Sequence, residues 1–150
     1  MTGIWKPSVT VAAVMQREGR FCLVEEEVDG RLVYNQPAGH WERDETLADA
    51  CSREALEETA HRFRPTHLLG VYRWHLASKD VTFLRFAFLG EATDAEPGHA
   101  RDKEIRRVLW LTPEEIRALA PRHRSPLVMT CVDDALAGRR YPLDLLRHLA

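Results

Sequence analysis

Hydrophobic and polar positions alternate with a period of two over the first third of the chain, as is typical of β-strands. This alternation predicts a first, mostly buried strand at residues 9–15. Residues 21–26 and 31–35 flank Asp29-Gly30. Both turn positions tolerate positive φ, so these segments predict a hairpin. Further strands are predicted at residues 68–75, 81–90 and 105–111.

The pattern changes to a helical period after residue 45. Thr46 is a suitable N-cap with Asp49 three residues later, which predicts a helix from Leu47 to Thr59. The other helix starts are a capping box at residues 112–115, Ser125-Pro126 for a longer helix ending near Gly138, and Pro142 for a last helical turn. This order of elements predicts an α+β protein in which helices pack on a mixed sheet.

The composition fits a small globular domain. The chain has 150 residues, of which 45% are hydrophobic and 29% charged, with a formal net charge of −2. We therefore expect a single domain over residues 1–150 with no nucleic-acid partner. No apolar run approaches the roughly 20 residues that span a bilayer, and residues 1–7 lack a signal-peptide pattern. We expect a cytoplasmic protein without a membrane partner.

The cysteines do not suggest a metal or disulfide framework. There are three of them, far apart and with no Cys-x-x-Cys pair: Cys22, Cys51 and Cys131. Neither a zinc finger nor a disulfide scaffold is therefore expected.

Acidic residues crowd one side of the helix predicted at Leu47–Thr59. At about 100° per residue, Glu54, Glu57 and Glu58 fall within one arc of about 100°. A neighbouring arc holds only small side chains, which can approach a sheet closely: Ala48, Cys51 and Ala55. Like charges at these spacings each cost a few tenths of a kcal/mol, whereas a hard cation such as Mg²⁺ binds several carboxylates. The alternative is a solvated face in which Glu58 pairs with Arg62 and Glu57 with Arg53.

The spacing of Gly39, Glu45 and the run Arg53-Glu54-Ala55-Leu56-Glu57-Glu58 resembles the Nudix box, the signature of the Nudix hydrolases. Segments outside the box resemble the NudJ-type phosphatase branch of that family: residues 5–7, 9–12, 24–26, 35–40, 83–86, 124–128 and 140–143. The resemblance covers nearly the whole chain. It implies the Nudix fold, an α/β/α sandwich with a mixed β-sheet and a loop–helix–loop box.

The end of the box departs from the family pattern. The family has a glycine followed by an aliphatic residue, whereas this chain has Ala60-His61. Glycine ends the helix there in a left-handed conformation, which would cost an alanine roughly 1–2 kcal/mol. Either Ala60 stays helical and the chain turns later, or the strain is accepted.

The resemblance also implies an activity, the hydrolysis of a diphosphate linkage by water with Mg²⁺, or Mn²⁺ as a substitute. The implied metal ligands are Glu54, Glu57, Glu58, the backbone carbonyl of Gly39, and Glu104 as a distal acidic ligand. Arg53 would orient Glu45, or else form an ordinary surface ion pair. Glu104 has the alternative of a solvated loop residue. The general base stays open between Glu54, Glu104 and a hydroxide on the metal.

Other side chains are candidates for substrate binding. Arg85 is the odd residue of an apolar strand, and either clamps a phosphate or covers an exposed face with its stem. Trp74 and Tyr34 either stack on a heterocycle or belong to the core. Arg124, beside a helix start at Ser125, is a candidate anion site.

The expected partner is a small-molecule diphosphate, bound by a monomer or a homodimer. The resemblance implies a phosphatase acting on thiamine pyrophosphate, hydroxymethylpyrimidine pyrophosphate and nucleoside tri- and diphosphates. One alternative is an enzyme that clears oxidised nucleoside triphosphates and releases diphosphate. Another is a non-catalytic module that binds a nucleotide as a sensor.

Overall fold

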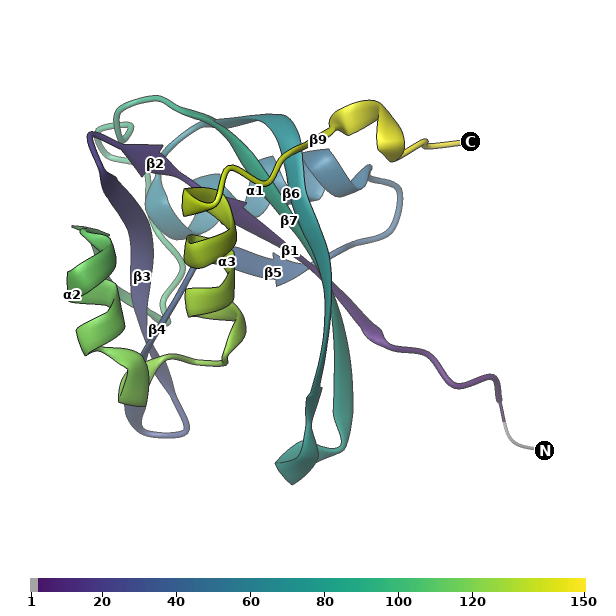
Figure 1. Cartoon of the computed structure of the whole chain (residues 1–150), viewed down its shortest axis with the longest axis horizontal. Coiled ribbons are helices and arrows are strands. Elements are labelled where there is room, and N and C mark those ends of the chain that lie inside the picture. Colours follow the sequence, from purple (N-terminus) through teal and green to yellow (C-terminus); the bar gives the residue numbers. More distant parts are fainter. Residues whose placement is uncertain (1–2) are drawn as a thin grey trace.

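The computed structural model describes residues 3–150, which form two β-sheets and the helices packed on them (Figure 1). The strands are β1 (Ser8–Val14), β2 (Gln16–Arg17), β3 (Arg20–Val28), β4 (Arg31–Asn35), β5 (Ala38–His40), β6 (Phe63–Leu76), β7 (Val81–Ala92), β8 (Ile105–Leu111) and β9 (Tyr141–Pro142). The α-helices are α1 (Leu47–Thr59), α2 (Pro113–Ala118) and α3 (Leu127–Leu136), and 3₁₀ turns lie at Ala77–Lys79, Ala120–Arg122 and Leu143–Leu145.

The larger sheet is mixed. Its strand order is β5-β1-β7-β6-β9, with β1 parallel to β7 and the remaining pairs antiparallel. In the second sheet β3 pairs with β2, β4 and β8. The register of the larger sheet places Thr10 beside His40 on one side and beside Arg85 on the other. Side chains in register lie on the same face, so these three form a row across the sheet.

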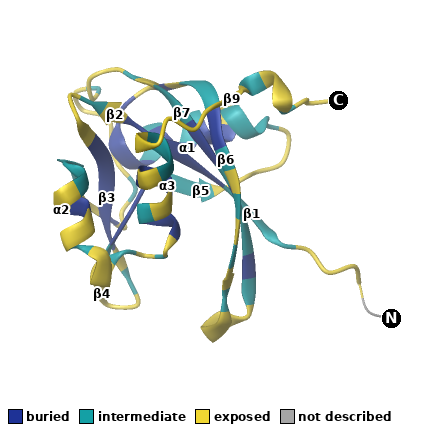
Figure 2. Cartoon of the chain, in the orientation of Figure 1, coloured by how far each residue is buried: buried dark blue, intermediate teal, exposed yellow. Residues whose placement is uncertain are grey.

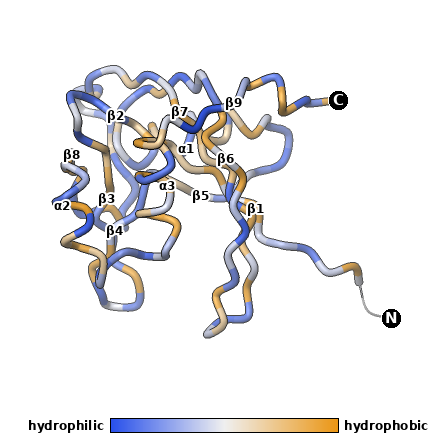
Figure 3. Tube along the Cα trace, viewed as in Figure 1, coloured by the Kyte–Doolittle hydropathy of each residue, from blue (hydrophilic) through white to orange (hydrophobic). Residues whose placement is uncertain are grey.

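Helices cover both faces of the larger sheet, which confirms the predicted sandwich. On one face, Val11 and Ala13 of β1 pack with Cys51 and Ala55 of α1. On the other face, Ala12 and Val14 belong to a cluster that includes residues of β3, α2 and α3. Burial is deepest in β1 and β3 (Figure 2), and the hydropathy of the chain is mixed along most elements (Figure 3).

Most of the predicted elements are confirmed. The helix at Leu47–Thr59 and the strand at Ile105–Leu111 have the predicted bounds, while the strand predicted from residue 68 begins at Phe63. The short strands β2, β5 and β9 were not predicted. The last helical turn is the 3₁₀ turn Leu143–Leu145, and all three cysteines are buried and free.

Two expectations concern membranes and targeting. No helix in the described part of the chain is long and apolar enough to cross a membrane. The segment without a signal-peptide pattern begins with residues 1–2, which lie outside the described residues.

Candidate active site

Helix α1 presents its acidic side to the larger sheet's edge strand, β5. It begins after Thr46, whose Oγ1 accepts a hydrogen bond of 3.0 Å from the backbone N–H of Asp49. Cys51 and Ala55 are completely buried, and Ala48 packs against the same cluster, which confirms the predicted arc of small side chains. This close packing holds the neighbouring glutamates at the edge of the sheet.

Three carboxylates meet beside the C-terminal half of α1. Oxygen atoms of Glu54, Glu57 and Asp102 lie within 4.8 Å of one another. Asp102 comes from the loop between β7 and β8, and its backbone N–H donates a 3.0 Å hydrogen bond to the carbonyl of Glu57. Asp102 was not predicted from the sequence, since it lies 45 positions beyond Glu57 and in no recognisable spacing. Only its place in the acidic segment that also holds Glu104 could have suggested it.

Burial and neighbouring negative charges raise the pKa of three carboxyl groups at this site. Burial, with the charges of Glu57 and Asp102, raises the pKa of Glu54 to about 7 against the opposing effect of Arg53. Burial raises the pKa of Glu58 to about 9, with Glu26, Glu54 and Asp102 adding to the effect. Burial and the charge of Glu57 also raise the pKa of Asp102. A set of hard oxygen donors with unbalanced negative charge fits a divalent cation such as Mg²⁺ or Mn²⁺.

Strand β5 aligns two of these carboxylates through its backbone. The N–H of Ala38 donates a 3.0 Å hydrogen bond to Oε1 of Glu58. A Cβ atom built on Gly39 would lie 2.1 Å from Cδ of Glu54 and 2.3 Å from both of its carboxylate oxygens. Residue 39 must therefore be glycine for Glu54 to keep its place. The structure puts Gly39, an expected carbonyl ligand, directly against the carboxylate group.

Arg53 holds Glu45 and Glu54 together. Its Nε and Nη2 donate hydrogen bonds of 3.0 and 2.9 Å to the two carboxylate oxygens of Glu45, and its Nη1 donates one of 2.9 Å to Glu54. The hydrogen bonds from Arg53 lower the pKa of Glu45. This bidentate geometry is more specific than an ordinary surface ion pair.

The solvated-face alternative fits only part of this helix. Glu57 does contact Arg53 at 3.3 Å, and its side chain is 41% exposed. Glu58, however, is buried, and Arg62 pairs with Glu96 instead. On the acidic side of α1, Glu54 and Glu58 therefore face the interior of a site, whereas Glu57 faces solvent.

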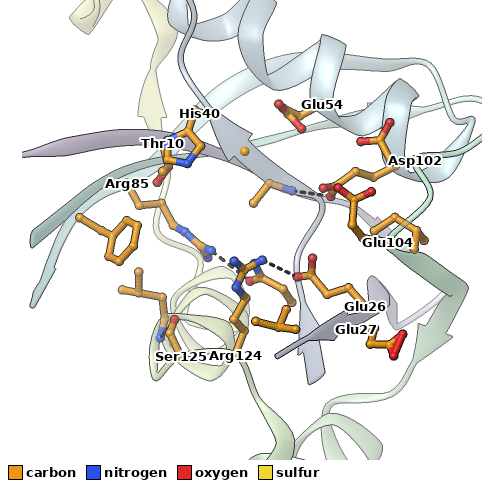
Figure 4. A pocket seen from close by; sticks show the side chains of 18 of the residues that line it. Thr10, Glu26, Glu27, His40, Glu54, Arg85, Asp102, Glu104, Arg124 and Ser125 are labelled. Carbon is orange, nitrogen blue, oxygen red and sulfur yellow. Dashed lines mark hydrogen bonds and ion pairs between the residues drawn. The ribbon is translucent and has the colours of Figure 1, made fainter. Parts of the chain in front are cut away.

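A cavity of about 570 Å³ extends from these carboxylates across the face of the larger sheet (Figure 4). One end is acidic and is lined by Glu54, Glu58, Asp102 and Glu104. Thr10, Trp74, Arg85 and Arg124 also line the cavity, with Glu26 paired to Arg124. A ligand bound in the cavity would therefore meet both carboxylates and guanidinium groups.

The predicted substrate-binding residues do not all reach this cavity. Trp74 lines it and stacks on Phe83, with ring centroids 5.7 Å apart and planes inclined by 16°. Arg124 lines it and pairs with Glu26 at 3.0 Å. Tyr34 is buried elsewhere and donates a 2.7 Å hydrogen bond to Glu25, so the structure places it in the core.

Arg85 and Glu104 both line the cavity. Arg85 is only 5% exposed, so the alternative that its stem covers an exposed face is wrong. Glu104 lies outside the close group formed by Glu54, Glu57 and Asp102.

Asn35 and Gln36 are functional candidates that sequence analysis missed. They accept the hydrogen bonds of Arg85. The signal available in the sequence was their position four and three residues before Gly39, in the segment 35–40 that resembles the NudJ-type branch.

The helix ends with strain at Ala60, which decides between the two alternatives left open by the sequence. Ala60 has φ 62° and ψ 8°, in the left-handed region, and its N–H donates to the carbonyl of Leu56. The turn directs its own carbonyl toward the loop that carries Asp102, where it accepts a 2.9 Å hydrogen bond from the N–H of Glu96. The unfavourable conformation thus attaches that loop to the end of α1.

Comparisons with known proteins agree with this geometry. The family model of the NUDIX domain matches residues 5–130. The chain is 41% identical over 143 residues to "Phosphatase NudJ" of Escherichia coli K12, covering 95% of this chain and 92% of that protein. It is similar to a solved NUDIX hydrolase from Nitrosomonas europaea, with a TM-score of 0.94 and 48% identity over 96% of this chain and 98% of that one. A MutT NUDIX hydrolase from Burkholderia pseudomallei, at 19% identity over 87% of this chain and 98% of that one, shares the fold with a TM-score of 0.73.

Proposed function

This chain belongs to the Nudix family of hydrolases, and we propose that it is a divalent-cation-dependent phosphatase of organic and nucleoside diphosphates and triphosphates. The proposed cation is Mg²⁺, with Mn²⁺ as a substitute. The proposed substrates are thiamine pyrophosphate, hydroxymethylpyrimidine pyrophosphate and nucleoside di- and triphosphates. Similarity to a protein named as a phosphatase supports the release of phosphate.

The observation that carries this proposal is the convergence of carboxylates on one end of the cavity. Glu54, Glu57 and Asp102 offer oxygens within 4.8 Å of one another, and Glu58 lines the same end. We assign Glu54, Glu57, Glu58 and Asp102 to the cation, together with the carbonyl of Gly39. Glu104, also at this end, is a further candidate ligand. A bound cation would neutralise phosphate charge and lower the pKa of water.

The remaining residues act by positioning. Arg53 fixes Glu54 and Glu45 through three of its hydrogen bonds, so that the Glu54 carboxylate keeps one orientation against Gly39. In the reaction, water oxygen bonds to phosphorus, the bridging P–O bond breaks, and one proton passes to a base. Glu54 and Glu104 both line the acidic end and are the side-chain candidates for that base. Such a reaction depends mainly on position and charge neutralisation, which this end of the cavity can supply.

Product analysis tests the substrate class. Thiamine pyrophosphate, a nucleoside diphosphate and a nucleoside triphosphate are each incubated with the protein and Mg²⁺, with an EDTA control. Release of orthophosphate that stops with EDTA is expected. Release of diphosphate from triphosphates would favour an enzyme that clears oxidised nucleotides. Binding without any product would favour a sensor and contradict the proposal.

Replacing Glu57 by glutamine tests the assignment of the carboxylates. Glu57→Gln removes a charge but little bulk, so turnover should fall about 100-fold or more, through loss of a cation ligand. The free energy of unfolding should change by no more than ~0.5 kcal/mol, because the side chain is partly exposed. Glu114→Gln on α2, an exposed residue, is the matched control and should keep full turnover. Near-normal turnover by a folded Glu57→Gln protein would remove Glu57 from the assigned group.

A further inference from the structure

Arg85 is a buried cation without a carboxylate partner. It is 5% exposed, and it forms no ion pair with the carboxylates of residues 3–150. By contrast, the buried acids Glu25 and Glu26 pair with Arg107 and Arg124. Burying an uncompensated charge is unfavourable by several kcal/mol unless hydrogen bonds or a counter-ion offset it.

Neutral side-chain amides hold the guanidinium of Arg85 in place. Its Nη1 donates a 2.9 Å hydrogen bond to Oε1 of Gln36 and a longer one of 3.8 Å to Sγ of Cys131, and its Nη2 donates one of 3.0 Å to Oδ1 of Asn35. Gln36 is itself fixed, since its Nε2 donates a 2.8 Å hydrogen bond to the carbonyl of Val128 in α3. The Nε–H of Arg85 is buried and has no partner among the described residues. The guanidinium is therefore oriented by the protein but not satisfied by it.

The wall around Arg85 also holds Arg124, whose charge is paired with that of Glu26, and the start of a helix. Arg85, Arg124 and Ser125 all line the cavity (Figure 4). Helix α3 begins at Leu127, which also lines the cavity, and its first turn contains no acidic residue. The N-terminal end of a helix carries partial positive charge. This wall lies across the cavity from the acidic end.

We propose that Arg85 is a specificity-determining residue that binds a phosphate group of the substrate other than the one held at the acidic end. This inference rests on the proposed function, because it takes the acidic end as the cation site. The uncompensated guanidinium charge of Arg85 and the partial positive charge at the start of α3 then favour the binding of a second phosphate.

Binding of inorganic phosphate to the cation-free protein tests the inference independently of hydrolysis. Orthophosphate is titrated into EDTA-treated protein and followed by isothermal calorimetry and thermal shift. Arg85→Gln should weaken phosphate binding 10-fold or more. Arg73→Gln is the matched control, because Arg73 is an exposed arginine of the neighbouring strand β6, and it should bind phosphate as the wild type does.

Arg85→Lys provides a second variant in case the glutamine variant does not fold. It keeps the charge but loses the planar set of donors, and should bind phosphate at least threefold more weakly. In kinetics, KM for a diphosphate substrate should rise about 10-fold in Arg85→Gln, whereas Arg73→Gln leaves it unchanged.

Two results would overturn the inference: no phosphate binding by the wild type, or unchanged phosphate binding by folded Arg85 variants. Because no step of this titration needs a cation or turnover, its failure leaves the proposed hydrolysis untouched, and an inactive enzyme leaves the phosphate result standing.

Discussion

Replacing Gly39 by alanine would put a methyl group where the Glu54 carboxylate now lies. The added Cβ would be 2.1 Å from Cδ of Glu54, whereas ordinary contacts of this kind begin at 3.4 Å, so the carboxylate would have to move by 3.4 − 2.1 = 1.3 Å. The backbone of Gly39 does not have positive φ, so alanine introduces no conformational strain of its own. The perturbation is thus confined to the position of one carboxylate.

The expected consequence is a large loss of activity with little loss of stability. Displacing a reacting or ligating group by about 1 Å can reduce turnover about 100-fold, and Mg²⁺ tolerates little distortion of its ligands. The moving group is the end of a flexible side chain, and alanine restricts the unfolded chain more than glycine does. The free energy of unfolding should therefore stay within about 1 kcal/mol of the wild type.

The assay is kcat/KM for a diphosphate at several Mg²⁺ concentrations, together with urea unfolding. Gly3→Ala is the control, because an added Cβ there would meet nothing within 4 Å. Glu54→Asp shortens the carboxylate by one methylene, so the Gly39→Ala/Glu54→Asp double variant should lose less than the two single losses combined. Turnover by Gly39→Ala within about threefold of the wild type, with unchanged Mg²⁺ dependence, would refute the steric reasoning.

Two further predictions concern stability. Ala60→Gly should change the free energy of unfolding by less than about 1 kcal/mol, because the relief of left-handed strain is offset by greater entropy of the unfolded chain and by the loss of a buried methyl group. Ala60→Val should destabilise the protein by about 2 kcal/mol or more, because a β-branched residue is strongly disfavoured at positive φ. Equal effects of the two variants in urea unfolding would contradict the left-handed turn. Hydrogen bonds from Arg107, and to a lesser extent from Tyr34, lower the pKa of Glu25 from 4.5 to about 2. Its stabilising contribution, on the order of 2 kcal/mol, is therefore fully present above pH 4.5 and is lost as the pH falls toward 2. The stability difference between the wild type and Glu25→Gln should shrink over that range, and a difference independent of pH would argue against the ion pair.

Local signals were sufficient to predict the helix that carries the site. Thr46 as N-cap and the small side chains at Cys51 and Ala55 describe α1 correctly, because capping and close packing depend on residues near in sequence. The end of the helix was harder. The sequence showed that Ala60 replaces a glycine, but the choice of the strained turn depends on Glu96, 36 positions away, whose backbone N–H donates to the Ala60 carbonyl.

The parts of the site that were missed depend on contacts distant in sequence. Alternation along β7 shows which residues share a face with Arg85, but not that α3 covers that face. For the same reason Tyr34 looked available for stacking, although it lies in the core against Glu25. Asp102 reaches Glu54 and Glu57 through backbone hydrogen bonds that attach its loop to α1, and no local sequence pattern indicates them.

That attachment has a consequence for how the protein can vary. Two backbone hydrogen bonds attach the loop to the end of α1, one from Glu96 to Ala60 and one from Asp102 to Glu57. Residues 98–101, which lie between these two attachment points, are exposed. Because each attachment is a backbone hydrogen bond, it does not depend on which side chain the loop residue carries. Insertions or deletions between the two attachment points would change the length of the loop without moving the carboxylate of Asp102. Residues 98–101 are therefore the place where the chain could gain new surface beside the reaction centre.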